Sequence, residues 1–198
     1  DRTGSSPRSA RSGFIERGHI RRTMKQTKMA PHAISVASPS FLGSLSSAQK
    51  PDEAAQVADA LVPDALAGLP ANPQWAEVAT MALRQQSFQR AKRDQVEASY
   101  APLKQAIEIA ERHLGPNHAD TAATMGLLSN TYGRFGEYKM QLATAQEALT
   151  RALAGLGAQR PHLTLTAVER WHAEALRRND RPADAVPILR RVLDDQRQ

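Results

Sequence analysis

The stretch from residue 100 to residue 149 constrains the fold most, because it contains helix-forming segments separated by short turns and then partly recurs. The pair Leu114-Gly115 returns 42 residues later as Leu156-Gly157. The turn that ends in Gly136-Glu137-Tyr138 returns 44 residues later. Self-similarity at a fixed period is typical of solenoids, whose units bury their cores only against their neighbours. The repeat therefore predicts an antiparallel helix-hairpin solenoid of two to three repeats.

Composition favours an all-α fold. Hydrophobic residues make up 41% of the 198 residues, aromatic residues only 5%, and most of the apolar residues are Ala and Leu. Both are strong helix formers, and extended runs of β-branched residues are missing. The chain has no cysteine, which excludes a disulfide scaffold and a thiolate metal site.

Positive charge is concentrated in the first 50 residues, which carry nine Lys or Arg against two acidic residues. Residues 51–198 carry 17 basic and 18 acidic residues, so the body gives no reason to expect a nucleic-acid binder. Residues 1–50 are rich in Ser and Arg without apolar periodicity, which predicts a disordered basic tail. Contact of this tail with nucleic acid or anionic lipid is a further interpretation, weakened because its charges are scattered.

A second interpretation of the same segment is a signal peptide. If Met24 is the start, Lys25 and Lys28 form a basic region, a weakly apolar region follows, and cleavage is expected near Ala48. The chain begins with Asp1, so a fragment or a processed product is also expected. Because no stretch is long and apolar enough to span a membrane, the sequence predicts a cytoplasmic protein, with export as the alternative.

The remaining chain divides into residues 51–73, predicted as a short helix that Pro63 breaks followed by a Pro-rich loop, and residues 74–198, the repeat domain. Composition, apolar spacing and turn residues (Gly, Pro and Asn179-Asp180) predict further helices at about 74–93, 94–114, 120–134, 137–154, 162–178 and from 183 onward. Asp120 or Thr121 is expected to cap the third of these. Val186, Leu189 and Leu193 are expected to face inward from the last.

One sequence motif resembles a known family. Residues 114–122 read Leu-Gly-Pro-Asn-His-Ala-Asp-Thr-Ala, and Leu128, Tyr132, Gly136, Tyr138 and Ala148-Leu149 follow. This pattern resembles the tetratricopeptide repeat (TPR) family, in the long-period form found in kinesin light chains, over about residues 75–198. The resemblance implies a non-catalytic module for protein–protein interaction.

Four positions depart from the family pattern. Gln141 replaces a small residue in a second helix, and Arg90 replaces an aromatic residue in the opening helix of the first repeat. Glu169 and His172 occupy positions in the last repeat that are usually apolar.

No motif in the chain predicts an enzyme. A Gly-rich phosphate loop, a GxSxG sequence and an HExxH sequence are all missing. His113 and His118 flank the Gly-Pro turn without further metal ligands nearby, so we interpret them as structural, as we do Trp171-His172. We therefore predict no catalytic residue, no cofactor and no metal, and no small-molecule substrate is evident.

The resemblance implies that the first helix of each repeat lines a concave groove for an extended or helical peptide. Carrying the groove positions over by register gives nine residues: Arg84, Phe88, Lys92, Asn130, Arg134, Arg170, Glu174, Arg177 and Arg178. Six of them are basic, and arginine fits carboxylates with a planar fork, whereas asparagine can bond a peptide backbone as both donor and acceptor. We expect a protein or peptide partner that is acidic or is held by its terminal carboxylate.

Other interpretations stay open at this point. The nine residues could be ordinary solvent-facing side chains. The repeats could be the regulatory or sensory region of a larger protein, such as a kinase or a transcription regulator, or an exported envelope protein.

Overall fold

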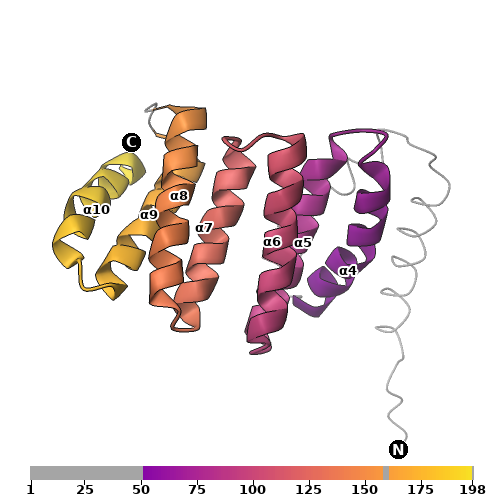
Figure 1. The fold of residues 1–198 in the computed structure, drawn as a ribbon, viewed down its shortest axis with the longest axis horizontal. Helices are drawn as coiled ribbons and strands as arrows, with labels where there is room; N and C mark the ends of the chain where they lie inside the picture. Colours follow the sequence, from indigo (N-terminus) through magenta and orange to yellow (C-terminus); the bar gives the residue numbers. More distant parts are fainter. Residues whose placement is uncertain (1–50, 158–160, 198) are drawn as a thin grey trace, which may run out of the picture.

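The structure, a computed structural model, describes residues 51–157 and 161–197 (Figure 1). All regular secondary structure in these ranges is α-helical, which confirms the predicted all-α solenoid. The helices stand side by side in chain order, with α4 at one end and α10 at the other (Figure 1). Their bounds are α4 Pro51–Gly68, α5 Trp75–Lys92, α6 Val96–His113, α7 Ala119–Arg134, α8 Tyr138–Leu156, α9 Leu163–Arg178 and α10 Pro182–Gln196. The tail and signal-peptide predictions, including those for Met24 and Ala48, concern residues outside these ranges.

Three helix hairpins, α5–α6, α7–α8 and α9–α10, are closed by the same turn. In each, a backbone amide just after the turn donates to the carbonyl five residues earlier, at 3.0 Å in all three. The bonds are Gln95 to Arg90, Glu137 to Tyr132, and Arg181 to Leu176. The residue before each donor has a positive φ: 59° at Asp94, 82° at Gly136 and 58° at Asp180. Because short polar residues and glycine tolerate this left-handed conformation, all three sequences form one turn despite their differences.

Helix α4 packs against α5 and extends beyond the predicted break. Leu61, Val62 and Ala65 belong to one buried cluster with residues of α5. Pro63 lies inside the helix and is exposed, so the prediction that it ends the helix is wrong. The burial of apolar residues on both sides of Pro63 holds the helical backbone there, although a proline inside a helix costs about 3 kcal/mol.

A second internal proline explains the unusual Arg90. Pro102 lies inside α6 and has no amide hydrogen to donate to the carbonyl of Ala98, four residues earlier. Arg90 Nη1 of α5 donates to that carbonyl at 3.0 Å. The departure from the family pattern at Arg90 therefore supplies the hydrogen bond that Pro102 cannot make.

Helix α7 is capped by a different residue from the predicted Asp120 or Thr121, so that prediction is wrong. The N-cap is His118, whose Nδ1 accepts a hydrogen bond from the Asp120 amide at 3.2 Å. Thr121 lies within the first turn and its hydroxyl donates to the Gly115 carbonyl at 2.8 Å. After the tight Gly115 turn, His118 is in an extended conformation and the helix begins at Ala119, so Asp120 and Thr121, two and three positions after His118, already lie inside the helix.

The last helix buries a different face from the predicted one. Ala185, Ile188 and Val192 are buried, and Ala185 and Ile188 pack with Ala173 and Leu176 of α9. Val186, Leu189 and Leu193 are exposed, so the prediction that they face inward is wrong. The two apolar stripes are offset by one residue, and periodicity alone does not say which of them meets the neighbouring helix.

Candidate peptide-binding face

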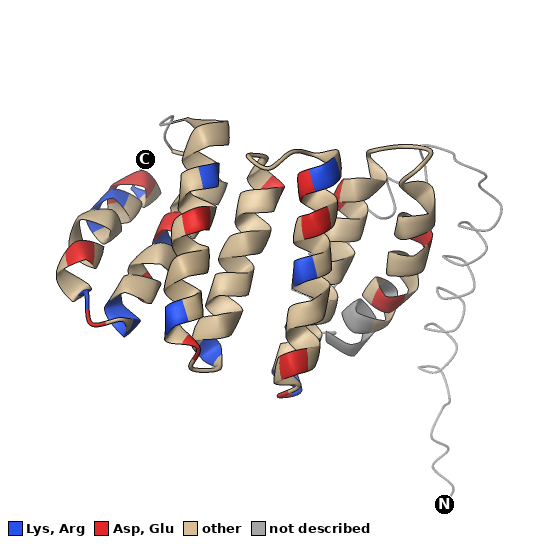
Figure 2. Cartoon of the chain, viewed as in Figure 1, with Lys and Arg blue, Asp and Glu red and all other residues tan. Residues whose placement is uncertain are grey.

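The nine candidate residues lie on α5, α7 and α9, the first helices of the three hairpins. The 42- and 44-residue offsets align Arg84 with Gly126 and Arg170. The same offsets align Phe88 with Asn130 and Glu174, and Lys92 with Arg134 and Arg178. We call these nine residues the α5–α7–α9 face. Acidic and basic residues are mixed over the described helices (Figure 2), so any local excess of positive charge on this face depends on which side chains are already paired.

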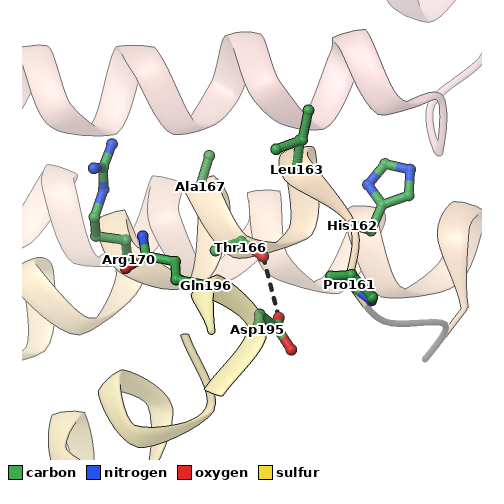
Figure 3. A pocket seen from close by; sticks show the side chains of 8 residues that line it. All are labelled: Pro161, His162, Leu163, Thr166, Ala167, Arg170, Asp195 and Gln196. Carbon is green, nitrogen blue, oxygen red and sulfur yellow. Dashed lines mark hydrogen bonds between the residues drawn. The ribbon is translucent and has the colours of Figure 1, made fainter. Parts of the chain in front are cut away.

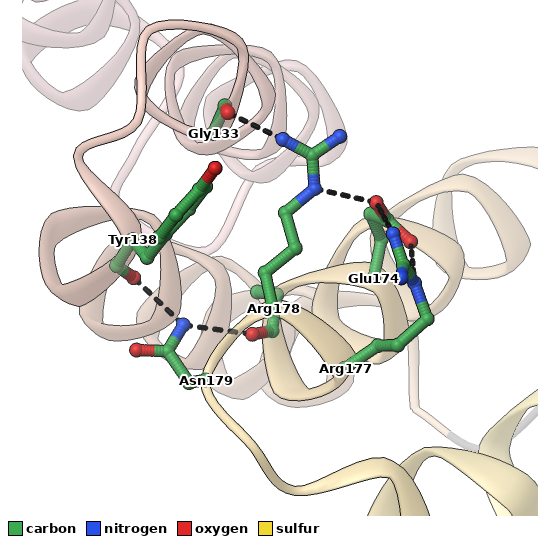
Figure 4. Close-up of polar contacts among 7 residues, drawn as sticks. Gly133, Tyr138, Glu174, Arg177, Arg178 and Asn179 are labelled. Carbon is green, nitrogen blue, oxygen red and sulfur yellow. Dashed lines mark hydrogen bonds and ion pairs between the residues drawn. The ribbon is translucent and has the colours of Figure 1, made fainter.

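Three of the nine form a closed ion-pair cluster at the end of α9 (Figure 4). The Glu174 carboxylate accepts hydrogen bonds from Arg177 Nε and Nη2, both at 2.8 Å, and from Arg178 Nε at 2.6 Å. Arg178 Nη1 also donates to the Gly133 carbonyl in the last turn of α7. A cation at this position is favourable because the C-terminal end of a helix carries partial negative charge. Arg178 therefore ties α9 to α7.

The next residue strengthens the same junction. Asn179 Nδ2 donates to the Tyr138 carbonyl and to the Ala175 carbonyl, each at 2.8 Å (Figure 4). The Arg178 guanidinium lies 5.8 Å from the centre of the Tyr138 ring. Neighbouring hairpins are thus joined by polar contacts that the spacing of residues along the sequence does not reveal.

This cluster gives a pH-dependent contribution to stability. Hydrogen bonds from Arg177 first, and then from Arg178, lower the pKa of Glu174 from 4.5 to about 2, against the effect of burial. Because the folded state holds its proton less tightly, the stabilisation is present above about pH 4.5 and is lost as the pH falls toward 2. The carboxylate is a third exposed, so we expect a contribution of about 1 kcal/mol.

Glu174→Gln should remove this contribution. We expect the variant to lose stability less steeply than the unmutated chain between pH 4.5 and 2, as measured by urea denaturation followed by circular dichroism. Asp184→Gln is the matched control, because Asp184 pairs with Arg181 at the exposed surface of α10. Identical pH profiles for Glu174→Gln and the unmutated chain would contradict the assignment.

Arg84 is also engaged within the fold. Its Nη1 lies 3.8 Å from the Asp120 carboxylate, which links α5 to the first turn of α7. Burial lowers the pKa of Arg84, and the charge of Asp120 partly opposes that effect. Asp120 was not predicted as part of the site. Its predicted role as a helix cap gave no indication that Arg84 would reach it.

The other predicted residues remain more accessible. Lys92 Nζ lies 4.7 Å from the centre of the Phe88 ring, and Arg134 lies 5.9 Å from that of Phe135. Asn130 is half-buried on α7, between the positions of Phe88 and Glu174 in the neighbouring hairpins. Lys92, Arg134 and Arg170 make no ion pair with any residue in the described part of the chain.

Arg170 lies at a pocket of about 330 Å³ between the start of α9 and the end of α10 (Figure 3). Leu163, Ala167 and Arg170 point to one side of α9, and Leu163 is 91% exposed. Thr166 donates to the Asp195 carboxylate at 3.1 Å across the pocket. Only Arg170 among these residues was predicted, because the contact between Thr166 and Asp195 depends on how α10 folds back.

Within the described ranges, no group of three or more His, Cys, Asp or Glu side chains is arranged to hold a metal ion. In the same ranges, no helix combines the length and the apolar character needed to cross a membrane. Trp171 packs on the cluster that contains Met125 and Leu165, as expected for a structural residue.

Comparison with known proteins agrees with the helix-hairpin fold. Residues 91–120, which include α6 and the start of α7, match the tetratricopeptide repeat family model. No curated protein sequence matches the chain. Two solved structures of kinesin light chain TPR-like repeats from Podosopora anserina are similar, with TM-scores of 0.57 and 0.53 and identities of 13% and 14%. Each alignment covers 93% of this chain and 90% of the other. The predicted resemblance to tetratricopeptide repeats of the kinesin-light-chain-like form is therefore confirmed.

Proposed function

We propose that the chain is a non-catalytic interaction module and that its α5–α7–α9 face binds an acidic segment of a protein partner. TPR repeats generally mediate protein–protein interaction, which supports the general class. The observation that carries the finer proposal is the set of three unpaired cations. Lys92, Arg134 and Arg170 are exposed, and one lies on each of the three successive first helices. By the repeat register Lys92 and Arg134 occupy the same position, and Arg170 lies eight residues before that position on α9, so the three cations suit a segment that crosses the hairpins obliquely.

The ion pairs of the fold narrow the group of residues available to a ligand. Arg84, Arg177 and Arg178 are already matched by Asp120 and Glu174, and breaking those pairs would oppose binding. Lys92, Arg134 and Arg170 can bind an acidic ligand without breaking an ion pair of the fold. Asn130 lies between them and can bond a peptide backbone with both its oxygen and its amide group.

The pocket beside Arg170 offers an anchor point. Its lining includes Leu163 and Ala167, with Arg170 at one side. An apolar side chain of the partner next to a carboxylate would satisfy both the apolar wall and the guanidinium. We therefore expect the preferred segments to combine acidic residues with an apolar one.

The test compares short fluorescent peptides that are acidic with counterparts in which Asp and Glu are replaced by Asn and Gln. We expect the unmutated chain to prefer the acidic peptides, with affinity that falls as salt is raised. The triple variant Lys92→Glu, Arg134→Glu, Arg170→Glu should bind them at least about tenfold more weakly, because exposed charge pairs contribute up to about 1 kcal/mol each. Fluorescence anisotropy measures both effects.

The matched control makes the same change of charge on the second helices of the hairpins. Lys104, Arg112 and Lys139 are exposed on α6 and α8, and their replacement by Glu should leave the affinity close to that of the unmutated chain. Circular dichroism serves to check that both triple variants remain helical. Equal loss in both variants, or no preference for the acidic peptides, would overturn the proposal.

A further inference from the structure

Two titratable residues of α9 occupy positions that are apolar in the preceding hairpin. The 44-residue offset aligns Glu169 with Met125 and His172 with Leu128. Met125 and Leu128 are buried in apolar clusters. Glu169 is only 1% exposed and His172 is half-buried. Because a charge is costly to bury, the stability of α9–α10, the last described hairpin, depends on how such groups are protonated and paired.

The surroundings of the His172 ring suit its neutral form. Its Nδ1 atom is buried and has no hydrogen-bond partner in the described part of the chain. A neutral imidazole carries a proton on one nitrogen only, whereas the charged ring carries an N–H on both. Protonation of the packed hairpin would therefore bury a charged N–H donor that has no acceptor, which opposes the packed state.

The charges around His172 do not compensate for this burial. Burial lowers the pKa of His172 from 6.5, the positive charge of Arg181 lowers it further, and Glu169 only partly opposes the two. Glu169 is itself engaged by Arg191 of α10, whose Nη2 lies 3.5 Å from the carboxylate. The clusters that α7 and α8 form with α9 are apolar, as at Leu142 of α8. The packed hairpin therefore binds the proton less tightly than the unfolded segment does.

We infer that His172 makes the α9–α10 hairpin an acid-sensitive element, which loosens from α7 and α8 when the ring takes up a proton. The stabilisation by the neutral ring is complete above about pH 6.5 and is lost progressively as the pH falls below that value. Within the described chain α9–α10 packs on one neighbouring hairpin, so it can open while the other two stay folded (Figure 1). Glu174 titrates below this range, because its pKa is about 2.

Loosening of this hairpin would alter the α5–α7–α9 face. The pocket beside Arg170 is lined by residues of both α9 and α10, so it exists only while these helices are packed together. The bond from Arg178 to the Gly133 carbonyl also requires α9 to stay on α7. A weaker affinity for an acidic segment at low pH would follow, and that consequence rests on the proposed function. The loosening itself does not, and it is measured without a ligand.

Hydrogen exchange of the full chain, followed by mass spectrometry between pH 7.5 and 5.5, tests the inference. The ratio of amide protection in α9–α10 to that in α5–α6 removes the effect of pH on intrinsic exchange, which both hairpins share. We expect this ratio to fall at least threefold on acidification of the unmutated chain. It should stay constant in His172→Leu, which places at this position the residue found at Leu128. Circular dichroism serves to check that each variant is helical.

His162→Leu is the matched control, because His162 caps the start of the same hairpin and its Nδ1 also lacks a partner among the described residues. This variant should show the same fall as the unmutated chain. Arg181→Gln should reduce the fall, because the pKa of His172 then moves back toward its ordinary value. A constant ratio in the unmutated chain, an undiminished fall in His172→Leu or Arg181→Gln, or a fall abolished by His162→Leu would each overturn the inference.

Discussion

Gly126→Ala should lower the free energy of unfolding by about 1–2 kcal/mol, although alanine is the better helix former by about 1 kcal/mol. A Cβ atom at this position would lie 2.2 Å from Cε3 and 2.5 Å from Cζ3 of Trp171. The indole ring is rigid and packs against a buried cluster, so it cannot turn aside, and α7 and α9 must separate instead. Urea denaturation followed by circular dichroism measures the change.

The background variant Trp171→Leu separates this clash from any other effect of the substitution. With the ring removed, Gly126→Ala should become stabilising by up to about 1 kcal/mol, because only the gain in helix propensity remains. A reversal of sign between the two backgrounds identifies the ring as the cause. A stabilising effect of Gly126→Ala with Trp171 in place would show that the helices separate at little cost.

The second large effect concerns Gly133 and Gln141, which face each other in the α7–α8 hairpin. Gln141 is only 1% exposed, and a Cβ on Gly133 would lie 2.4 Å from its Cδ and Nε2 atoms. The large residue on α8 is thus accommodated by the missing side chain on α7. We expect Gly133→Ala alone to destabilise by about 1–3 kcal/mol, the range typical of overpacked cores.

The double variant Gly133→Ala, Gln141→Ala should recover most of that loss. Equivalent positions in the first hairpin hold Ala91 and Ser99, a pairing of two small residues that the same fold tolerates. Removal of Gln141 also eliminates its buried Oε1, which has no hydrogen-bond partner among the described residues. A double-mutant cycle by urea denaturation should give a favourable coupling of about 1–3 kcal/mol, and additivity of the two changes would contradict the pairing.

The fold accommodates the residues that depart from the tetratricopeptide repeat pattern through contacts with neighbouring helices. Gln141 fits because Gly133 leaves space, and Arg90 fits because Pro102 leaves a carbonyl without a donor. Glu169 is buried on α9, and Arg191 of α10 lies 3.5 Å from its carboxylate. In each of these three cases, the residue that accommodates the unusual side chain lies on a neighbouring helix. It therefore cannot be identified from the local sequence around the unusual residue.

The candidate face could be predicted only in part. The repeat period was enough to place all nine residues on the first helices of the hairpins, because helix register follows from sequence spacing. Which of these charged side chains form ion pairs within the fold was not predictable. Arg84 pairs with Asp120, which is 36 residues away in sequence, and Arg178 bonds to Gly133, which is 45 residues away. Only the packed structure therefore shows which of the basic side chains form ion pairs and which do not.

The sequence by itself determined the helical class, a solenoid of two to three repeats, and the turns at Gly136 and Asp180. These features depend on interactions within a few residues: helix propensity, glycine or a short polar residue at a positive φ, and proline after a helix. Only the tertiary structure decided how α10 is rotated, whether Pro63 ends its helix, and which arginines are paired. Such features depend on the free energy of packing against another helix, which outweighs local preferences and is absent from any single segment of the chain.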